Sequence, residues 1–179
     1  RAERAGLAIS GRAAILEKQF FKGKYDIVGV QESRLQGNLP RDGEHYSMFA
    51  SSANKKGDLG VQCWVARRLT NQVADVRPIS PRLLGLVLSL GDVRVVILVG
   101  HAPHSLDTPA TRELFYDAMD ALIDAYRRRY RAAMRLLLLG DFNGRVGSVA
   151  SPSVGPWAPE VENDGGMRLR QFAEAHQLC

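Results

Sequence analysis

The chain is poor in cysteine and has no long uninterrupted apolar run. Its 179 residues include two cysteines, Cys63 and Cys179, which lie far apart. Two thiols placed in this way form neither a disulfide framework nor a zinc ligand set, and they predict an intracellular protein, cytoplasmic or nuclear. The most apolar stretch, residues 83–100, is interrupted at Gly91 and Asp92, so it predicts two strands joined by a tight turn and no membrane span.

Two familiar catalytic signatures are absent as well. The chain has no G-x-S-x-G, the motif that carries the nucleophile of many serine hydrolases. It also lacks G-x-x-x-x-G-K-[ST], the phosphate-binding loop of many nucleotide-binding proteins. These absences argue against a serine hydrolase and against a P-loop protein, and we expect no small-molecule cofactor.

Composition and charge are those of an ordinary globular domain. Hydrophobic residues make up 45% and charged residues 24% of the chain, and its length suits one domain with a sizeable core. Lysine and arginine outnumber aspartate and glutamate by 24 to 19, which gives a net charge of +5. This excess permits an anionic partner such as nucleic acid, although a basic, solvated surface explains it equally well.

Hydrophobic patterning predicts strands that alternate with three helices. Strand-like runs occupy residues 25–32, 45–50, 60–66, 83–90, 93–100 and 136–139, and helical patterns occupy 11–22, 108–131 and 167–178. The runs 45–50 and 60–66 are predicted to pair antiparallel, and Gly91-Asp92 is typical of a hairpin connection. A strand hairpin with only three helices favours a layered α+β sandwich over a doubly wound parallel sheet.

The long helix predicted over residues 108–131 has recognisable signals at both ends. Thr108 followed by Pro109 is typical of an N-cap with proline at the first helical position. The other end carries the basic segment RRRYR. A basic last turn complements the helix dipole, and we favour that role over a nucleic-acid contact. We therefore expect that neutralising Arg127–Arg129 leaves DNA binding almost unchanged.

Polar side chains follow three of the predicted strands at the points where these strands end. Glu32 ends the first run, His101 and His104 follow a later one, and Asp141 and Asn143 follow the four consecutive leucines. If the three strands are neighbours in one sheet, their tips converge, and we expect these side chains to cluster. Two carboxylates, an amide and an imidazole suit a hard cation such as Mg²⁺ better than they suit zinc.

Each of these residues also has an ordinary structural explanation. Glu32 alone is typical of a surface carboxylate that follows a strand, and Asp141 alone is typical of a turn or a helix cap. The histidines on either side of the Ala102-Pro103 pair could simply bond the loop backbone. It is the recurrence of polar groups at three strand ends that favours a functional site.

The segments VGVQES (28–33), HAPH (101–104) and LLLLGDFNGRVG (136–147) resemble, in order and spacing, motifs of the endonuclease/exonuclease/phosphatase superfamily. Within it, GDFNGRVG and the later NDGGMRLRQFAEAHQL are most similar to the apurinic-type endonuclease domain of non-LTR retrotransposon polyproteins. The resemblance runs from about Ala14 to Cys179 and implies a DNase-like fold, a four-layered α/β/β/α sandwich. It also implies hydrolysis of phosphodiester bonds in DNA that depends on Mg²⁺, or on Mn²⁺ in its place.

The resemblance assigns roles to three positions of this sequence. Glu32 matches the glutamate that ligates the catalytic metal. Asp141 matches the aspartate that orients or activates the attacking water. Asn143 matches the asparagine that contacts the scissile phosphate. The resemblance thus implies one metal ligand and two residues that act on the water and the phosphate.

Further positions are expected to lie near the DNA backbone. His101 occupies the place where relatives carry a tyrosine or histidine close to the phosphate, and the resemblance implies a catalytic role for it. His104 and Arg145 are expected to support substrate binding. Arg34 and Arg168, together with Arg145, are expected to neutralise a few phosphates of DNA.

Two departures from the superfamily pattern affect what the chain can do. The superfamily opens with a strand that ends in a metal-proximal asparagine, and it closes with strands that carry an Asp and then an Asp-His pair. Residues 1–179 match neither, so we expect a single domain, truncated at both ends and nearly inactive by itself. Two alternatives stay open: a phosphoesterase of the same superfamily that acts on a small phosphorylated substrate, and a non-catalytic remnant that only binds nucleic acid.

Overall fold

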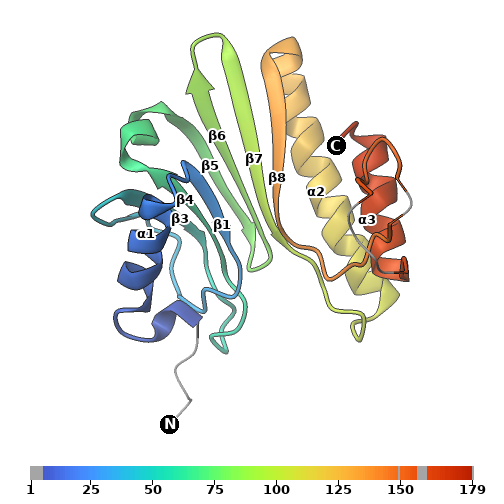
Figure 1. Cartoon of the computed structure of the whole chain (residues 1–179), viewed down its shortest axis with the longest axis horizontal. Coiled ribbons are helices and arrows are strands. Elements are labelled where there is room, and N and C mark those ends of the chain that lie inside the picture. The colour runs from blue at the N-terminus through green and yellow to red at the C-terminus, as the bar shows by residue number, and fades with distance from the viewer. Residues whose placement is uncertain (1–5, 149, 157–160, 179) are drawn as a thin grey trace. The chain divides into compact units, whose positions relative to one another are not determined.

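Figure 1 shows the computed structural model, which describes residues 6–148, 150–156 and 161–178. The chain divides into two compact units. The larger unit comprises Arg1–His101 and Met119–Gly140, and the smaller unit comprises Ala102–Ala118 and Asp141–Cys179. Within the described ranges, no helix is both long and apolar enough to cross a membrane.

The first sheet of the larger unit contains four antiparallel strands in the order β1-β4-β3-β2. Their bounds are Ile27–Val30 for β1, Arg41–Asp42 for β2, Tyr46–Ser51 for β3 and Val61–Ala66 for β4. The predicted antiparallel pairing of the runs 45–50 and 60–66 is confirmed as β3 beside β4. Nearly every residue of these two strands is buried, because both faces of the sheet are covered.

The second sheet has the order β5-β6-β7-β8. Its strands are Val73–Ser80 for β5, Leu83–Leu90 for β6, Val93–His101 for β7 and Met134–Asp141 for β8. The predicted hairpin is confirmed: β6 and β7 pair antiparallel, and Gly91 between them has a φ of 59°, which glycine adopts without steric cost. The sequence pattern missed β5, an edge strand that contains Pro78 and no alternation of apolar residues.

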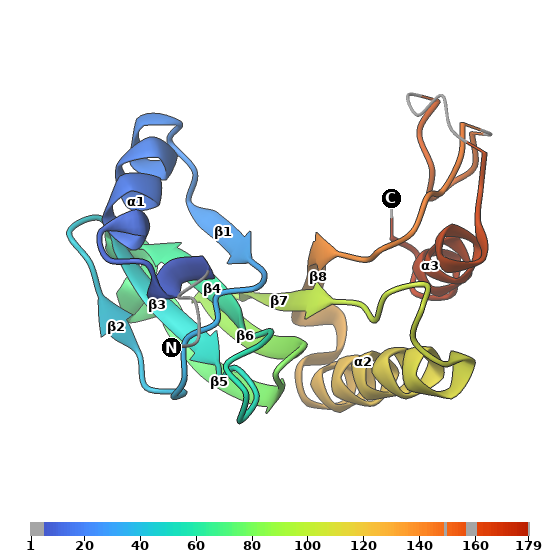
Figure 2. The same ribbon diagram turned by 90° about the horizontal axis from the view of Figure 1, so that it is seen from below.

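Strands β7 and β8 lie side by side and run parallel. The backbone N–H of Ala102 donates to the carbonyl of Asp141 at 2.9 Å, so the carboxyl ends of the two strands are joined. A parallel pair needs a crossover connection, and helix α2 (Pro109–Tyr130) supplies it. The segments HAPH and GDFN therefore begin at the same edge of the sheet (Figure 2).

The larger unit is a four-layered sandwich, as predicted. Between the two sheets lies an apolar core of Phe49, Val61, Cys63, Val65, Leu84, Leu86, Leu88, Ile97 and Val99. Helix α1 (Arg12–Lys22) covers the other face of the first sheet, where Phe20 packs near Trp64. The second half of α2 covers the other face of the second sheet, close to Gly85, through the buried Tyr126. The order is α/β/β/α.

Strand β1 does not lie beside β7 and β8 in one sheet, and the prediction that it does is wrong. It pairs with β4 and approaches β7 and β8 from the opposite sheet. A Cβ atom at Gly29 would lie 2.9 Å from Leu139 Cβ and 3.3 Å from Val99 Cγ1. The apolar pattern missed this arrangement because a strand covered on both faces has the same pattern in either sheet.

The ends of β1 and β7 nevertheless face the same side of the sandwich. In Figure 1 both strands run downward, and so does β8. Val99 and Leu139, the residues next to Gly29, each lie close to the end of their strands. Glu32 and His101 therefore leave the larger unit at one edge, although they come from different sheets.

In the smaller unit, the first half of α2 packs against helix α3 (Asp164–Ala175). The ring centroids of Tyr116 and Phe172 are 5.4 Å apart in this contact. Helix α3 begins earlier than the pattern predicts, because Asn163 caps it. The side-chain oxygen of Asn163 accepts the backbone N–H of Gly166 at 2.8 Å and satisfies one of the unpaired amides of the first turn.

Both ends of α2 carry the predicted signals. The hydroxyl of Thr108 accepts the backbone N–H of Thr111 at 3.2 Å, which confirms the N-cap. The last turn contains three consecutive arginines. Among them Arg129 lies 3.9 Å from a carboxylate oxygen of Asp75, and its guanidinium carbon lies 5.3 Å from the ring centre of Tyr130. These contacts support the stabilising role over a nucleic-acid contact.

Candidate functional site

The turn that follows β8 explains why four leucines run into an aspartate. Asp141 ends the strand with its side chain exposed, and its Oδ1 accepts the backbone N–H of Asn143 at 3.0 Å. This bond holds Asn143 at a φ of 48°, a left-handed conformation that asparagine tolerates better than most residues. The other carboxylate oxygen, Oδ2, has no hydrogen bond or ion pair within the described part of the chain. Asp141 is thus a turn residue that keeps one oxygen available.

The side chain of Asn143 is held in a fixed orientation. Its Nδ2 donates to the carbonyl of Ala102 at 2.8 Å, and the N–H of Ala102 donates to the carbonyl of Asp141 at 2.9 Å. These two bonds join the loop after β7 to the turn after β8. Because the amide nitrogen is engaged, the plane of the Asn143 amide is set before any ligand arrives.

His101 is the last residue of β7 and is 6% exposed. Its backbone is bonded on both sides by Arg82: the His101 N–H donates to the Arg82 carbonyl at 2.9 Å, and an Arg82 guanidinium nitrogen donates to the His101 carbonyl at 3.3 Å. His104, in contrast, is exposed, and its Nδ1 lies 3.2 Å from the hydroxyl of Ser105. The imidazole of His104 thus contacts a side-chain hydroxyl of its own loop, rather than the loop backbone.

Glu32 follows β1 on a segment whose backbone is tightly bonded. The next residue, Ser33, donates its N–H to the carbonyl of Gly60 at 2.9 Å. The Glu32 side chain is 52% exposed, and its Oε2 lies 3.2 Å from a guanidinium nitrogen of Arg34. Arg34 also lies 3.7 Å from a carboxylate oxygen of Asp58. The Glu32 carboxylate is thus paired with an arginine.

Glu32 and Asn143, which lie in the motifs, and Arg34, which directly follows one of them, have positive φ angles. The values are 50° for Glu32, 55° for Arg34 and 48° for Asn143. For residues with a side chain the left-handed conformation costs roughly 1–2 kcal/mol. Such strain gathers at functional sites, where the surrounding structure maintains it. The backbone thus favours a functional reading of the segments after β1 and β8.

The donor set fits magnesium better than zinc. Within the described ranges, no group of three or more His, Cys, Asp and Glu side chains could hold a metal ion. Mg²⁺ does not need such a group, because it is often bound through one or two carboxylates, several waters and the substrate phosphate. Glu32 and Asp141 are exposed carboxylates of this kind. The approach of Glu32, in the larger unit, to Asp141, in the smaller one, stays a prediction.

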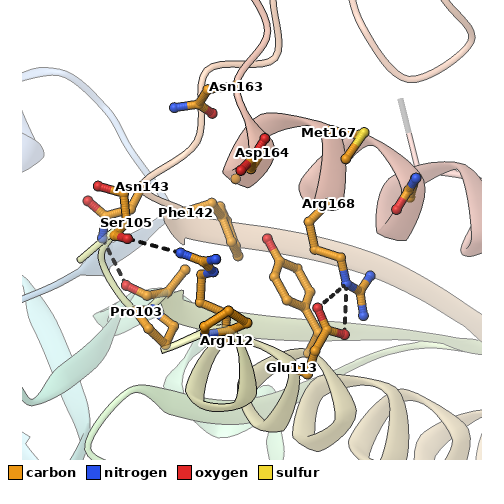
Figure 3. Close-up of a pocket in the computed structure, with 15 residues that line it drawn as sticks. Pro103, Ser105, Arg112, Glu113, Phe142, Asn143, Asn163, Asp164, Met167 and Arg168 are labelled. Atoms are coloured by element: carbon orange, nitrogen blue, oxygen red, sulfur yellow. Dashed lines mark hydrogen bonds and ion pairs between the residues drawn. The ribbon is translucent and has the colours of Figure 1, made fainter. Parts of the chain in front are cut away.

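A pocket of about 630 Å³ lies beside Asn143 in the smaller unit (Figure 3). Arg168 lines it, with its Nε 3.1 and 3.2 Å from the two carboxylate oxygens of Glu113. The guanidinium carbon of Arg168 also lies 4.2 Å from the ring centre of Tyr116. Burial raises the pKa of Tyr116 to about 12; Arg168 opposes this shift and Glu113 adds to it.

Sequence reasoning missed several residues of this pocket. Arg112 lines it and donates from its guanidinium to the carbonyl of Ser105 at 3.0 Å, while Glu113 and Tyr116 supply the pairing and stacking partners described above. All three lie on the first turns of α2, where the helical pattern suggested only solvent and core positions. No local motif marks Glu113 and Tyr116, because their partner Arg168 comes from α3, 55 residues after Glu113 in the chain.

The structure is similar to several solved structures, two of them described as endonucleases, at low sequence identity. The endonuclease domain of TRAS1, a telomere-specific non-LTR retrotransposon, is 18% identical with a TM-score of 0.60, and the match covers 96% of this chain and 68% of that domain. The AP endonuclease LMAP from Leishmania major is 18% identical with a TM-score of 0.64, and the match covers 95% of this chain and 63% of that one. Truncated Caenorhabditis elegans TDP2 is 16% identical with a TM-score of 0.56, and the match covers 76% of this chain and 59% of that one. The chain therefore has the fold of the endonuclease/exonuclease/phosphatase superfamily, as its motifs predict.

Sequence comparison finds distant relatives only. No family model matches the chain. Craniofacial development protein 2 is 21% identical over 171 residues in Bos taurus and 22% identical over 171 residues in Tragulus javanicus. Each alignment covers 94% of this chain but 28% and 29% of the two relatives, so the chain spans less than a third of their length.

Proposed function

We propose that this chain contributes to divalent-metal-dependent hydrolysis of phosphodiester bonds, as a DNA endonuclease domain of a retrotransposon-type polyprotein. The bonded cluster of Asp141, Asn143 and the Ala102 backbone, at the joined ends of β7 and β8, is the observation that carries this proposal. Its support comes from solved structures of the same fold, two of which are described as endonucleases.

Each group of the site has a distinct task in the proposed reaction. Asp141 positions the attacking water through Oδ2, while its Oδ1 stays bonded to the turn. Asn143 orients the scissile phosphate, and His101 donates to a phosphate oxygen. Glu32 would hold Mg²⁺ or Mn²⁺, which offsets negative charge on the phosphoryl and leaving oxygens when bound. Removing one preorganised donor of this kind typically costs ~10²–10³ in rate.

The Glu32–Arg34 ion pair gives Arg34 a part in this proposal. The pair is at least one-third exposed on each side, so water screens it and it opens at little cost. If Glu32 held a metal, the guanidinium of Arg34, which also lies 3.7 Å from a carboxylate oxygen of Asp58, would be available to a phosphate of the DNA backbone. Arg145 and Arg168 are the other proposed phosphate contacts, and the pairing of Arg168 with Glu113 reduces its expected share.

Nicking of supercoiled plasmid in the presence of Mg²⁺ tests the proposal. Because the resemblance assigns an essential histidine to strands beyond the matched motifs, the assay compares residues 1–179 with a form extended through those strands. We expect the extended form to nick far faster, and Glu32→Ala and Asp141→Ala to abolish nicking. If both forms nick equally fast and Glu32→Ala abolishes it, the histidine is dispensable and this mechanism is wrong.

Salt dependence separates a DNA substrate from a small phosphorylated one. Each phosphate contact on duplex DNA contributes about −0.9 to the slope of log K against log salt concentration. We expect a clearly negative slope for duplex binding, reduced by about 0.9 in Arg145→Gln, as one contact would predict. A slope indistinguishable from zero would favour a phosphoesterase that acts on a small substrate. Neutralising Arg127–Arg129 is the control and should leave the slope unchanged.

A further inference from the structure

A second candidate site surrounds the segment FFKGKY, residues 20–25, which comprises the end of α1 and most of its connection to β1. The segment interleaves aromatic and basic residues. A hollow of about 620 Å³ lies beside it, and its lining includes Phe21, Lys22, Lys24, Tyr25 and His45. Glu32 follows the far end of β1, seven residues after Tyr25, so at about 3.3 Å per residue the two sites are at most roughly 23 Å apart.

Two aromatic rings of this segment are exposed although they are large and apolar. Phe21 is 56% exposed and Tyr25 is 59% exposed. One face of Phe21 stacks on His45, with ring centroids 3.8 Å apart and an angle of 7° between the planes. His45 is anchored in turn, because its backbone N–H donates to the buried carboxylate of Glu17 at 2.6 Å. The supported ring of Phe21 thus presents a flat apolar surface to a ligand.

The backbone of the segment is shaped to hold Tyr25 in place. A Cβ atom at Gly23 would lie 2.5 Å from Cε2 and 2.9 Å from Cδ2 of Tyr25, so the ring folds over the glycine. Lys24 between them has a φ of 59°, the left-handed conformation that residues with a side chain rarely adopt. The carbonyl of Tyr25 accepts the hydroxyl of Tyr46 at 2.5 Å. These features fix the exposed ring rather than leave it loose.

The charges that line the hollow are net positive, because Lys22, Lys24, Arg67 and Arg68 outnumber Asp26 and Glu44, and this excess favours an anionic ligand. Arg68, which lines it, is paired with Asp26 at 2.5 Å. Lys22 and Lys24, in contrast, have no ion pair or side-chain hydrogen bond within the described part of the chain. The two ammonium groups flank the exposed rings and are available to phosphates. Rings with cations interleaved are typical of surfaces that bind single-stranded nucleic acid.

We propose that FFKGKY binds a single-stranded segment of nucleic acid, with bases stacked on Phe21 and Tyr25 and phosphates beside Lys22 and Lys24. A single strand can lay its bases flat on these rings, whereas the bases of a duplex are already stacked on one another. The interaction goes beyond the proposed cleavage and needs neither a metal nor Asp141. A peptide that fills the hollow is the competing occupant, and the two lysines weigh against it.

Binding of a single-stranded oligothymidylate, followed by fluorescence anisotropy in EDTA, tests the stacking. The protein carries Glu32→Ala, which removes the proposed nuclease activity. We expect the Phe21→Ala, Tyr25→Ala double variant to bind at least about tenfold more weakly, since stacking on one aromatic ring contributes on the order of tenfold per base. It should also lose the quenching of a 2-aminopurine placed in the strand. Ile15→Ala, on the exposed face of α1, is the matched control and should bind normally.

The lysines are tested by salt dependence. On single strands each phosphate contact contributes about −0.7 to the slope, so Lys22→Gln with Lys24→Gln should reduce it by about 1.4. Lys55→Gln with Lys56→Gln removes the same charge from an exposed turn elsewhere in the larger unit and should change the slope little. All four lysine side chains are exposed, so circular dichroism and the melting temperature of both lysine variants should match those of the parent protein.

Two results would overturn the inference. Unchanged binding and quenching in the double aromatic variant would show that no base stacks there, which would leave the hollow to a protein partner. Equal effects of the two lysine pairs would show that only net charge matters. The test is independent of the nuclease proposal: single-strand binding by this chain together with no nicking by the extended form would refute only the proposed function, and nicking by the extended form without such binding would refute only this inference.

Discussion

Replacing Gly29 by alanine places a methyl group between β1 and the opposite sheet. That carbon would lie 2.9 Å from Leu139 Cβ and 3.3 Å from Val99 Cγ1. Neither neighbouring atom is the far end of a flexible side chain, so the strands themselves must move. Overpacking of a core in this way typically costs ~1–3 kcal/mol. At ~2–4 °C per kcal/mol for a chain of this size, the melting temperature should fall by roughly 2–12 °C.

The same change should reach the proposed active site. Glu32 follows β1 shortly after Gly29, so a strand displaced from β7 and β8 carries the Glu32 carboxylate away from its working position. A misplacement of about 1 Å can cost on the order of 10²-fold in rate. We therefore expect Gly29→Ala to slow plasmid nicking by the extended form by roughly this factor, at a temperature where the variant is fully folded.

Gly85→Ala is the matched control. A Cβ atom there would lie 2.9 Å from the Tyr126 hydroxyl and 3.0 Å from Leu122 Cδ2, on the face of the second sheet that α2 covers. It should lower the melting temperature to a similar or smaller extent and leave the nicking rate of the folded protein unchanged. If Gly29→Ala melts and nicks like the parent protein, the close packing of β1 on β7 and β8 is refuted. Equal loss of nicking in both variants would attribute the loss to stability alone.

The remaining predictions concern single groups. Asn143→Ala removes the hydrogen bond to the Ala102 carbonyl and should lower the free energy of unfolding by ~1 kcal/mol. It should also lower the rate of plasmid nicking by ~10²–10³, and an unimpaired rate would contradict the proposed role of Asn143. Glu17→Ala leaves the backbone N–H groups of His45 and Tyr46 unpaired and should lower the free energy of unfolding in urea by about 2–4 kcal/mol. A change near zero would show that water replaces the carboxylate. Burial raises the pKa of Cys63 to about 12 and that of Tyr116 to about 12, from 9.0 and 10.0. Both protonated forms are favoured by folding, so the urea midpoint should be unaffected below about pH 8.5 and fall as pH rises towards 12; a flat alkaline profile would contradict this.

Much of the local structure followed from the sequence because local physics decides it. The Gly91-Asp92 turn and the Thr108 cap depend on neighbours a few residues away, and β3 pairs with the next strand along the chain, from Ser51 beside Val61 to Tyr46 beside Ala66. Edge strand β5 was missed because a half-buried strand that contains Pro78 has no alternation to reveal it. The early start of α3 was missed because the cap at Asn163 lies outside the apolar pattern.

In the candidate site, too, the sequence predicts the local contacts and misses those between residues distant in the chain. Asp141 and Asn143 are two residues apart, so one turn brings them together, and the polar motif after the leucines was enough to find them. Arg168, in contrast, is paired with Glu113 and stacked on Tyr116, and Glu113 lies 55 residues before it in the chain. Residue spacing in the sequence does not predict such partners. Which carboxylate a guanidinium pairs with depends on which one lies closest to it in the folded structure.

By itself the sequence determined which runs become strands and helices, which residues gather at strand ends, and the superfamily whose fold the chain shares. The tertiary structure alone decided that β1 belongs to the first sheet and approaches β7 and β8 across the core at Gly29. The physical reason is that apolar periodicity records whether a side chain is buried, and records nothing of which surface buries it. The choice between two sheets rests on packing between strands that are distant in the chain, where the absence of a single Cβ atom permits one arrangement.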